Sequence, residues 1–205
     1  MLNFNSENNL IEKGFVPVAG VDEAGRGTWA GPVVAGAVSL DVKIIPKRLR
    51  LGLDDSKKLA SKKRKELYQL LLDYARVGVG LSSVNEIDKL NILQATMLAM
   101  KRAVVDLGLK PGMVLVDGNH IPNWIYPSQA IIKGDRQSPS IAAASIVAKV
   151  SRDKVMADLA LDYPQYGWER NAGYGTKAHR QGLAEFGICE HHRRSFKPIK
   201  NIIAV

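Results

Sequence analysis

Short apolar segments that end at acidic residues are the feature that most constrains the fold of this chain. Such β-rich segments span residues 15–21, 31–40, 77–84, 113–116 and 129–132. The first ends at Asp22-Glu23, the fourth ends at Asp117, and the fifth is followed by Lys133-Gly134-Asp135. The last two segments are typical of interior strands in a sheet that helices cover on both faces.

Between these segments, apolar residues recur at the spacing of amphipathic helices. The pattern predicts helices over residues 61–74, 91–107, 140–161 and 176–186. Ser61, Ser138 and Thr176 are the expected N-caps of three of them, because a hydroxyl accepts a hydrogen bond from the first turn. Early consecutive strands, followed by strands that alternate with helices, indicate an α/β fold with a mixed sheet. The length of 205 residues favours one domain.

Positive charge is concentrated in two blocks of the sequence. Lys and Arg number 29 against 20 Asp and Glu, which gives a formal net charge of +9. Residues 41–65 carry ten cations and three acids, and residues 177–200 carry six cations and two acids. Two basic blocks around a locally acidic body favour a polyanionic partner, although a solvated surface accounts for the charge equally well.

The single cysteine, Cys189, cannot form an internal disulfide. No paired Cys and His spacing indicates a structural zinc, so a reduced, cytoplasmic setting is expected. Residues 1–14 lack the basic start and apolar run of a signal peptide. No segment approaches the ~18 consecutive apolar residues of a membrane span. We therefore expect no membrane association.

Asp22, Glu23, Asp117 and Asp135 are the candidate catalytic residues. Ligands gather at the carboxyl ends of strands in α/β sheets, so these acids can meet in one cleft. Converging carboxylates repel one another, and a hard divalent cation is the usual compensation. Asp117-Gly118 and Gly134-Asp135 are also common turn sequences. The residues alone therefore leave a metal site and simple turns equally well supported.

Five sequence blocks resemble the type 2 ribonuclease H family, specifically bacterial ribonuclease HII, and they occur in that family's order. They are Val21-Asp22-Glu23-Ala24-Gly25-Arg26-Gly27, Asp55-Ser56-Lys57-Lys58-Leu59, Val116-Asp117-Gly118-Asn119, the run from Lys133-Gly134-Asp135 to Arg152-Asp153, and Gly173-Tyr174-Gly175-Thr176. Together they span residues 21–176. Any one block is weak, whereas five in order are highly specific.

The resemblance implies a ribonuclease H-like fold, in which helices flank a mixed five-stranded sheet and a C-terminal helical extension follows. One such domain would occupy residues 1–205, with a catalytic core over about 15–165 and the extension and basic tail over about 166–205. By the family pattern, Asp22, Glu23, Asp117 and Asp135 are both the catalytic residues and the metal ligands. Asp153 is a rival for the fourth position, but it lies inside a predicted helix, so we favour Asp135.

The resemblance further implies a metal-dependent endonuclease. It would hydrolyse the RNA strand of RNA–DNA hybrids and incise 5′ of ribonucleotides embedded in duplex DNA, leaving 3′-hydroxyl and 5′-phosphate ends. Two Mg²⁺ or Mn²⁺ ions would activate the water and stabilise the leaving oxygen. The expected partners are hybrids and ribonucleotide-containing duplexes, and the expected oligomeric state is a monomer.

Substrate contacts are expected from a glycine-rich loop and two further residues. The backbone of Gly25, Arg26 and Gly27 can approach a sugar closely and bond its 2′-hydroxyl, which distinguishes RNA from DNA. By resemblance, Tyr174 contacts the deoxyribose beyond the RNA–DNA junction, and Lys57 is a candidate phosphate contact. Other basic residues could contact phosphates or be solvated surface: Lys58, Lys62, Lys63, Arg64, Lys65, Arg193, Arg194 and Lys197.

Two features depart from simple expectations. Many relatives have Pro-Leu after Gly-Arg-Gly, whereas this chain has Thr28-Trp29, which puts the local groove contacts in doubt. His191-His192 lies in the basic tail, where surface or nucleic-acid contact is favoured over zinc. His179 could face the groove and is left without a role.

Three alternative classes are weighed against this interpretation. Ribonuclease HIII carries an extra N-terminal domain, whereas only ~15 residues precede the first expected strand here. A non-catalytic basic nucleic-acid-binding module would explain the charge but not the clustered acids. A metal-dependent phosphatase or resolvase would not need the Gly25-Arg26-Gly27 loop.

Overall fold

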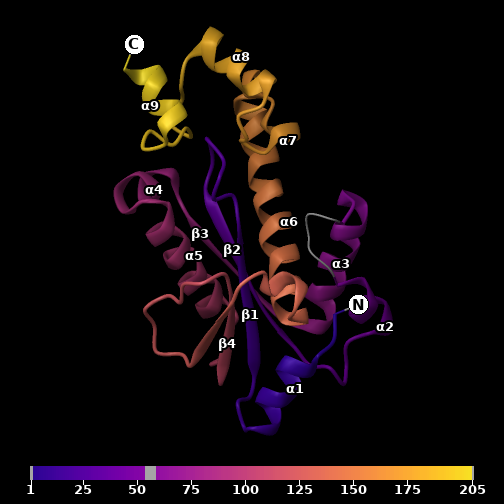
Figure 1. The fold of residues 1–205 in the computed structure, drawn as a ribbon. Helices are drawn as coiled ribbons and strands as arrows, with labels where there is room; N and C mark the ends of the chain where they lie inside the picture. Colours follow the sequence, from indigo (N-terminus) through magenta and orange to yellow (C-terminus); the bar gives the residue numbers. More distant parts are fainter. Residues whose placement is uncertain (1, 54–58, 205) are drawn as a thin grey trace.

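The computed structural model describes residues 2–53 and 59–204, which fold around one mixed sheet of five strands (Figure 1). The strands are β1 (Val18–Ala24), β2 (Val33–Leu40), β3 (Ala75–Ser82), β4 (Met113–Asp117) and β5 (Ser128–Ile131), in the spatial order β3-β2-β1-β4-β5. β2 is antiparallel to both β1 and β3, whereas β1, β4 and β5 run parallel. The expected mixed five-stranded sheet is confirmed, and the carboxyl ends of its three parallel strands lie at the same end of the sheet.

Two long helices cover the two faces of the sheet, α5 (Ile92–Asp106) on one and α6 (Pro139–Asp162) on the other. Glycines in the strands let both helices approach closely. A Cβ atom added at Gly80 of β3 would overlap the α5 backbone, and one added at Gly36 of β2 would overlap the α6 backbone. Small residues therefore set the spacing of the three layers.

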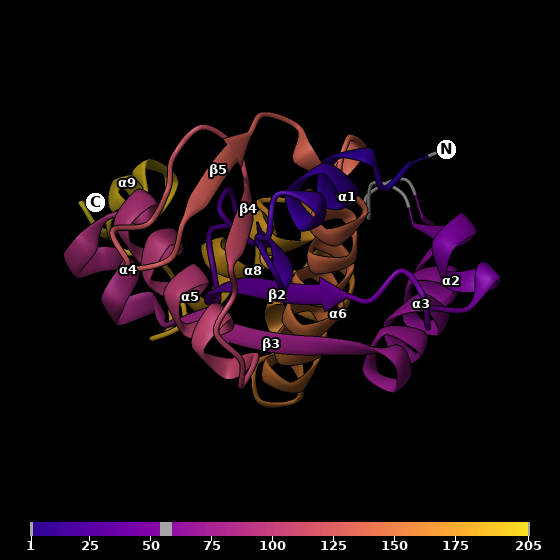
Figure 2. The ribbon, with the colours of Figure 1, turned by 90° about the horizontal axis from the view of Figure 1, so that it is seen from below.

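The remaining helices lie around these layers. They are α1 (Asn5–Glu12), α2 (Lys47–Gly52), α3 (Ser61–Tyr74), α4 (Val84–Leu90), α7 (Trp168–Asn171), α8 (Lys177–Phe186) and α9 (Lys197–Ile203), with 3₁₀ turns η1 (Gly134–Arg136) and η2 (Pro164–Tyr166). Figure 2 shows α4 and α5 on one side of the molecule and α2 and α3 on the other. No helix within the described residues is long and apolar enough to cross a membrane.

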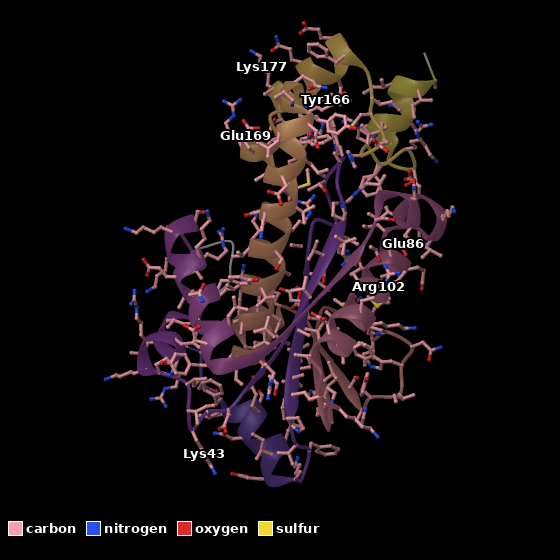
Figure 3. The ribbon with its side chains drawn as sticks, turned by 180° about the vertical axis from the view of Figure 1, so that it is seen from behind. Lys43, Glu86, Arg102, Tyr166, Glu169 and Lys177 are labelled. Carbon is pink, nitrogen blue, oxygen red and sulfur yellow. The ribbon has the colours of Figure 1, made fainter. Side chains whose placement is uncertain are left out.

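Side chains of α5 occupy the outer edge of β3. Asp106 accepts a hydrogen bond from the Val79 amide at 2.8 Å, and Arg102 donates one to the Leu81 carbonyl oxygen at 2.6 Å. Arg102 also binds both carboxylate oxygens of Glu86 in α4 (Figure 3), and this contact lowers the pKa of Glu86 to about 2. These contacts satisfy backbone groups that an open sheet edge would leave exposed.

The predicted helix boundaries agree closely with the structure. The helix expected over 61–74 spans those residues, but Ser61 is its first residue and not its cap, and the N-cap position, Ala60, offers no side-chain bond. Ser138 and Thr176 cap α6 and α8 as expected, by accepting from amides three residues later.

Three of the expected strands differ from the structure. The strand expected over 15–21 spans Val18–Ala24, so Asp22 and Glu23 lie within it and not after it. The strand expected over 77–84 ends at Ser82, because Ser83 forms a capping box with Glu86 and starts α4. The strand expected over 129–132 is not interior, since β5 is the edge strand and its residues are partly exposed. The apolar run was therefore a poor guide to strand position at this edge.

The N-terminal helix α1 was not predicted, and it holds the start of α6. Glu7 is buried, and its Oε1 accepts hydrogen bonds from the Ser138 hydroxyl at 2.6 Å and the Ser140 amide at 3.1 Å. A carboxylate is favourable at this position because a helix N-terminus carries partial positive charge.

An aromatic cluster joins the C-terminal helices to the C-terminal half of α6. Tyr166 and Trp168 are buried and their ring centroids lie 5.0 Å apart (Figure 3 labels Tyr166). The same cluster includes Met156 of α6 and Ala30, which lies between β1 and β2. The C-terminal segment is thereby fixed beside the loop that follows β1.

Candidate active site

The four candidate acids follow from the strand register. Asp22 and Glu23 lie near the end of β1, Asp117 ends β4, and Asp135 lies in η1 shortly after β5. The parallel pairing of β1 with β4 places Val21 opposite Val116, so that Asp22 and Asp117 are the next residues on adjacent strands. The structure therefore brings the acids to one edge of the sheet.

Asp22 is the buried centre of this group, with only 8% of its surface exposed. Burial raises the pKa of Asp22 well above its ordinary value, and the nearby carboxylates of Glu23, Asp117 and Asp135 raise it further. A hydrogen bond from the Glu23 amide to Asp22 Oδ1, at 2.7 Å, opposes this effect. The mutual repulsion of four carboxylates and their oxygen chemistry fit a hard divalent cation.

Protein donors hold two of these carboxylates. The Gly134 amide donates to Asp117 Oδ1 at 2.7 Å, and Arg26 Nη1 lies 3.3 Å from Glu23 Oε1. In this arrangement, no three His, Cys, Asp or Glu side chains of the described residues are grouped as a metal site. A divalent cation bound at these carboxylates would compete with the Gly134 amide and the Arg26 guanidinium for the same oxygens.

A cleft of about 390 Å³ is lined by Asp22, Glu23 and Asp135 and is walled by one face of α6. Ser145, Lys149 and Arg152 line it, at spacings of four and three residues along the helix. The sequence indicates no role for these residues, although their helical spacing indicates that they share a face. Asp153 is held by Lys149 at 2.6 Å and lies 3.9 Å from Arg64.

The Gly25-Arg26-Gly27 loop lines the same cleft and rests on the buried guanidinium of Arg152. Gly25 has φ +96°, and a Cβ atom there would overlap Arg152 Nε. Arg152 is fixed in place because it donates to the carbonyl oxygens of Pro32 and Ala172 at 2.9 and 2.8 Å, and to the Thr28 hydroxyl at 2.8 Å. Glycine is therefore required at position 25.

Arg193 supports the other side of this loop, which corrects its assignment as a candidate phosphate contact. Its side chain is fully buried and donates to the carbonyl oxygens of Arg26 at 3.0 Å and Gly31 at 2.9 Å. Burial and the nearby charge of Arg152 lower the pKa of Arg193 to about 9. A side chain buried in this way cannot reach a phosphate in solvent.

Tyr174 and Thr28-Trp29 take different positions relative to the cleft. The Tyr174 side chain lines it and is 48% exposed. Thr28 is buried, and its hydroxyl lies 3.1 Å from the carbonyl oxygens of Gly25 and Ala30. Trp29 packs against Gly175, where an added Cβ atom would overlap its ring. Thr28 therefore supports the Gly25–Gly27 loop, and Trp29 supports the segment around Gly175, each on the side away from the cleft.

Two histidines lie in the interior and not where the sequence suggested. His179 and His192 are both fully buried, so that His179 does not face the groove and His192 is not a surface residue. Their Nε2 atoms lie 3.0 Å apart. Burial lowers the pKa of His179, and burial with the neighbouring His179 lowers the pKa of His192 to about 4.

These shifts make stability depend on pH. Both imidazoles titrate near pH 6.5 when unfolded and at lower pH when folded, so that the unfolded state binds more protons in this range. We expect the free energy of unfolding to fall by about 2–3 kcal/mol between pH 6.5 and pH 4, most of it from His192. Urea unfolding of the wild type and His192→Asn at pH 7 and pH 4.5 measures this. Equal pH dependence in both proteins would contradict the assignment.

The basic residues near α3 do not form one class. Arg64 is buried, lines the cleft and donates to the Leu59 carbonyl oxygen at 2.8 Å, whereas Lys62 and Lys65 are exposed and Lys63 is partly exposed. The predicted phosphate contacts Lys57 and Lys58 lie outside the described residues.

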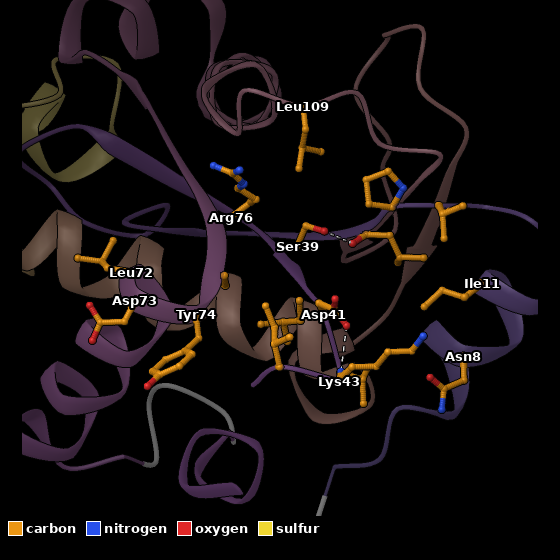
Figure 4. Close-up of a pocket in the computed structure, with 17 residues that line it drawn as sticks. Asn8, Ile11, Ser39, Asp41, Lys43, Leu72, Asp73, Tyr74, Arg76 and Leu109 are labelled. Carbon is orange, nitrogen blue, oxygen red and sulfur yellow. Dashed lines mark hydrogen bonds between the residues drawn. The ribbon is translucent and has the colours of Figure 1, made fainter. Parts of the chain in front are cut away.

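Cavity size does not locate the acids. A larger cavity, of about 860 Å³, lies at the start of β1, between α1 and the end of β2 (Figure 4). Its walls include Ile11, Val18 and Tyr74, and Ser39 is held by a hydrogen bond to the Val18 carbonyl oxygen at 2.8 Å. The four clustered acids lie at the other end of β1.

The fold is that of the ribonuclease H class of nucleases. The structure is similar to ribonuclease H2 from Pyrococcus horikoshii, with a TM-score of 0.72 and 31% identity over 91% of this chain and 97% of that one. It is also similar in fold to the crystal structure of Bst-RNase HIII in complex with Mn²⁺, with a TM-score of 0.72 and 19% identity over 92% of this chain and 69% of that one.

The sequence assigns the chain more closely. A sequence model of the family Ribonuclease HII matches residues 19–199. The chain is 53% identical to the ribonuclease HII of Ruegeria pomeroyi over 202 residues, which cover 98% of this chain and 85% of that protein. The chain belongs to the ribonuclease HII family and is an endoribonuclease. The alternative of a non-catalytic binding module is therefore excluded.

Proposed function

We propose that this protein hydrolyses the RNA strand of RNA–DNA hybrids and incises duplex DNA on the 5′ side of embedded ribonucleotides, leaving 3′-hydroxyl and 5′-phosphate ends. The observation that carries the proposal is the grouping of buried Asp22 with three further carboxylates beside the Gly25–Gly27 loop. Membership of the ribonuclease HII family supports it.

The four carboxylates are the proposed ligands of the divalent cations. Asp22, Glu23, Asp117 and Asp135 would hold Mg²⁺ or Mn²⁺, and two bound ions would supply water activation and stabilisation of the departing 3′ oxygen. Lys149 and Arg152 on α6 place positive charge on the cleft wall, where it attracts the phosphodiester.

The glycine loop is the proposed reader of the ribose. Arg26 and Gly27 are exposed, and the space around a Cβ position at Gly27 is open to at least 4 Å. Arg152 and Arg193 fix the loop from beneath through the bonds described above, so that its backbone is held ready for a 2′-hydroxyl. Tyr174, across the cleft, is the proposed contact for the next deoxyribose.

Cleavage of defined duplexes tests the proposal. We would incubate the protein with Mg²⁺ or Mn²⁺ and three matched substrates: a duplex with one embedded ribonucleotide, an RNA–DNA hybrid and an all-DNA duplex. We expect cleavage of the first two, no cleavage of the third, and no reaction after chelation. Equal cleavage of the first and third would refute ribose recognition. The proposed monomer is checked by the molar mass of the protein in solution.

Three lysines of α3, two exposed and one partly exposed, are expected to contribute to binding through phosphate contacts. Replacing Lys62, Lys63 and Lys65 by Gln, with buried Arg64 retained, should weaken binding and flatten its salt dependence, because log affinity changes by ~0.9 per neutralised phosphate for each tenfold change in salt. The matched control replaces Lys13, Lys43 and Lys110, which precede or follow strands at the opposite end of the sheet. Equal salt slopes in both triple variants would show that the α3 lysines are ordinary surface.

A further inference from the structure

We infer that His179 and Trp29 are positioning residues for Tyr174, and that together they fix the spacing between Tyr174 and the Gly25–Gly27 loop. This spacing determines whether the protein can engage a single ribonucleotide and the deoxyribose beside it at the same time. The inference rests on the proposed function, because it explains how two proposed sugar contacts are held in register.

A buried hydrogen-bonded chain holds the Tyr174 backbone. His179 Nδ1 lies 3.0 Å from the Tyr174 carbonyl oxygen, which can only accept, so this nitrogen carries the proton. His179 Nε2 is therefore an acceptor, and it receives the Trp168 indole N–H at 3.2 Å. At the far end, the Cys189 amide donates to His192 Nδ1 at 2.9 Å.

The second imidazole fits the same pattern. Because His192 Nδ1 accepts a hydrogen bond, His192 Nε2 carries the proton and donates to His179 Nε2, 3.0 Å away. Each ring is neutral, and the single lone pair of His179 Nε2 is shared between the Trp168 and His192 donors. The series of hydrogen bonds thus runs from the backbone at Cys189, through two imidazoles, to the carbonyl of Tyr174. Its direction is fixed by the two backbone groups at its ends.

Trp29 links this chain to the glycine loop. Its amide donates to the Gly173 carbonyl oxygen at 2.8 Å, and its carbonyl oxygen accepts from the Arg193 amide at 2.8 Å. Its ring fills the space beside Gly175, and the ring centroid lies 5.9 Å from that of His179. Trp29 therefore stands between the two loops and contacts the segment on both sides of Tyr174.

These contacts make a selective prediction. A duplex with one ribonucleotide offers the protein one 2′-hydroxyl followed by a deoxyribose, so the two loops must be in register for cleavage. A continuous RNA strand offers many ribonucleotides and does not present that junction at each site. Displacing Tyr174 should therefore impair single-ribonucleotide cleavage more than hybrid cleavage.

The test measures the ratio of kcat/KM for the single-ribonucleotide duplex to kcat/KM for the hybrid. In His179→Asn, the side-chain amide can replace Nδ1–H as donor, whereas His179→Leu cannot donate. We expect the ratio to fall about tenfold in His179→Leu and to stay near wild type in His179→Asn. Trp29→Leu should lower the ratio as well. His191→Asn is the matched control, since His191 is outside the hydrogen-bonded chain described above.

A double-mutant cycle separates positioning from general damage. In a Tyr174→Ala background, His179→Leu should cause no further fall in the ratio, because the residue it positions is gone. A further tenfold fall, or equal loss on both substrates in the Tyr174-containing protein, would overturn the inference. Failure of the wild type to cleave the single-ribonucleotide duplex would instead refute the proposed function.

Hydrogen exchange provides a readout that does not depend on cleavage. The Gly173 and Tyr174 amides bond to Asn171, and the Thr176 amide bonds to the Tyr174 carbonyl oxygen at 2.8 Å. We expect faster exchange over residues 173–176 in His179→Leu and unchanged exchange in His179→Asn. The same exchange rates in both variants would overturn the positioning role even in a protein that does not cleave.

Discussion

Asp117→Asn should lower kcat for cleavage by about 1000-fold or more while substrate binding stays intact or becomes tighter. The loss of a metal-binding carboxylate removes several kcal/mol of transition-state stabilisation, and about 4 kcal/mol corresponds to about 1000-fold. The fold should survive, because the Asn carbonyl oxygen can still accept from the Gly134 amide that now donates to Asp117. Relief of repulsion at buried Asp22 should keep the melting temperature at or above the wild-type value.

Single-turnover kinetics and binding without divalent cation measure the two parts of this expectation. Asp135→Asn and Asp153→Asn form a matched pair because, of these two residues, Asp135 contributes to the repulsion at Asp22 and Asp153 does not. Asp135→Asn should resemble Asp117→Asn, whereas Asp153→Asn, which loses a contact with Lys149, should keep most activity. Wild-type rates in Asp117→Asn, or a larger loss at Asp153 than at Asp135, would contradict the assignment.

Gly25→Ala should reduce both stability and single-ribonucleotide cleavage. Its φ of +96° strains any L side chain by about 1–3 kcal/mol, and the new Cβ atom would overlap Arg152 Nε, which is held by several hydrogen bonds. For a chain of this size, about 2 kcal/mol corresponds to a fall in melting temperature of about 4–8 °C. Thermal unfolding and kcat/KM on the single-ribonucleotide duplex measure the two effects.

Gly27→Ala is the informative control for this change. Nothing lies within 4 Å of a Cβ atom at position 27, so the melting temperature should stay at the wild-type value. The methyl group would nevertheless stand where a sugar is expected to approach the loop, so cleavage should fall. Unchanged cleavage in Gly27→Ala would show that the ribose does not come close to this backbone, and unchanged stability in Gly25→Ala would contradict the overlap with Arg152.

The sheet and the grouping of acids could be predicted from the sequence because local patterns specify them. Apolar strands that end at Asp22, Asp117 and the turn before Asp135 need only a parallel register to bring the acids together. The resemblance to ribonuclease HII added the substrate and the loop roles. Position within the sheet was harder, since the apolar run at residues 130–132 suggested an interior strand, whereas β5 lies at the edge.

The supports of the site could not be predicted because they join segments far apart in the chain. Arg193 bonds to the carbonyl of Arg26, and Glu7 to the hydroxyl of Ser138, and no local periodicity marks either pair. A charged residue in a basic tail is most simply interpreted as solvated, yet Arg193 is buried. The burial of His192 has the same origin, since an aromatic cluster built from three segments encloses it.

Chemical analysis of the cleaved ends tests the central claim most directly. We would incise a duplex with one embedded ribonucleotide in the presence of Mg²⁺ or Mn²⁺ and determine both new termini by mass spectrometry. Hydrolysis by water at the grouped carboxylates predicts a 3′-hydroxyl on the upstream DNA and a 5′-phosphate on the ribonucleotide. A 2′,3′-cyclic phosphate would contradict it, because the attacking group would then be the ribose 2′-hydroxyl and not water. Incision on the 3′ side of the ribonucleotide would contradict the proposed position of the cleaved phosphodiester bond.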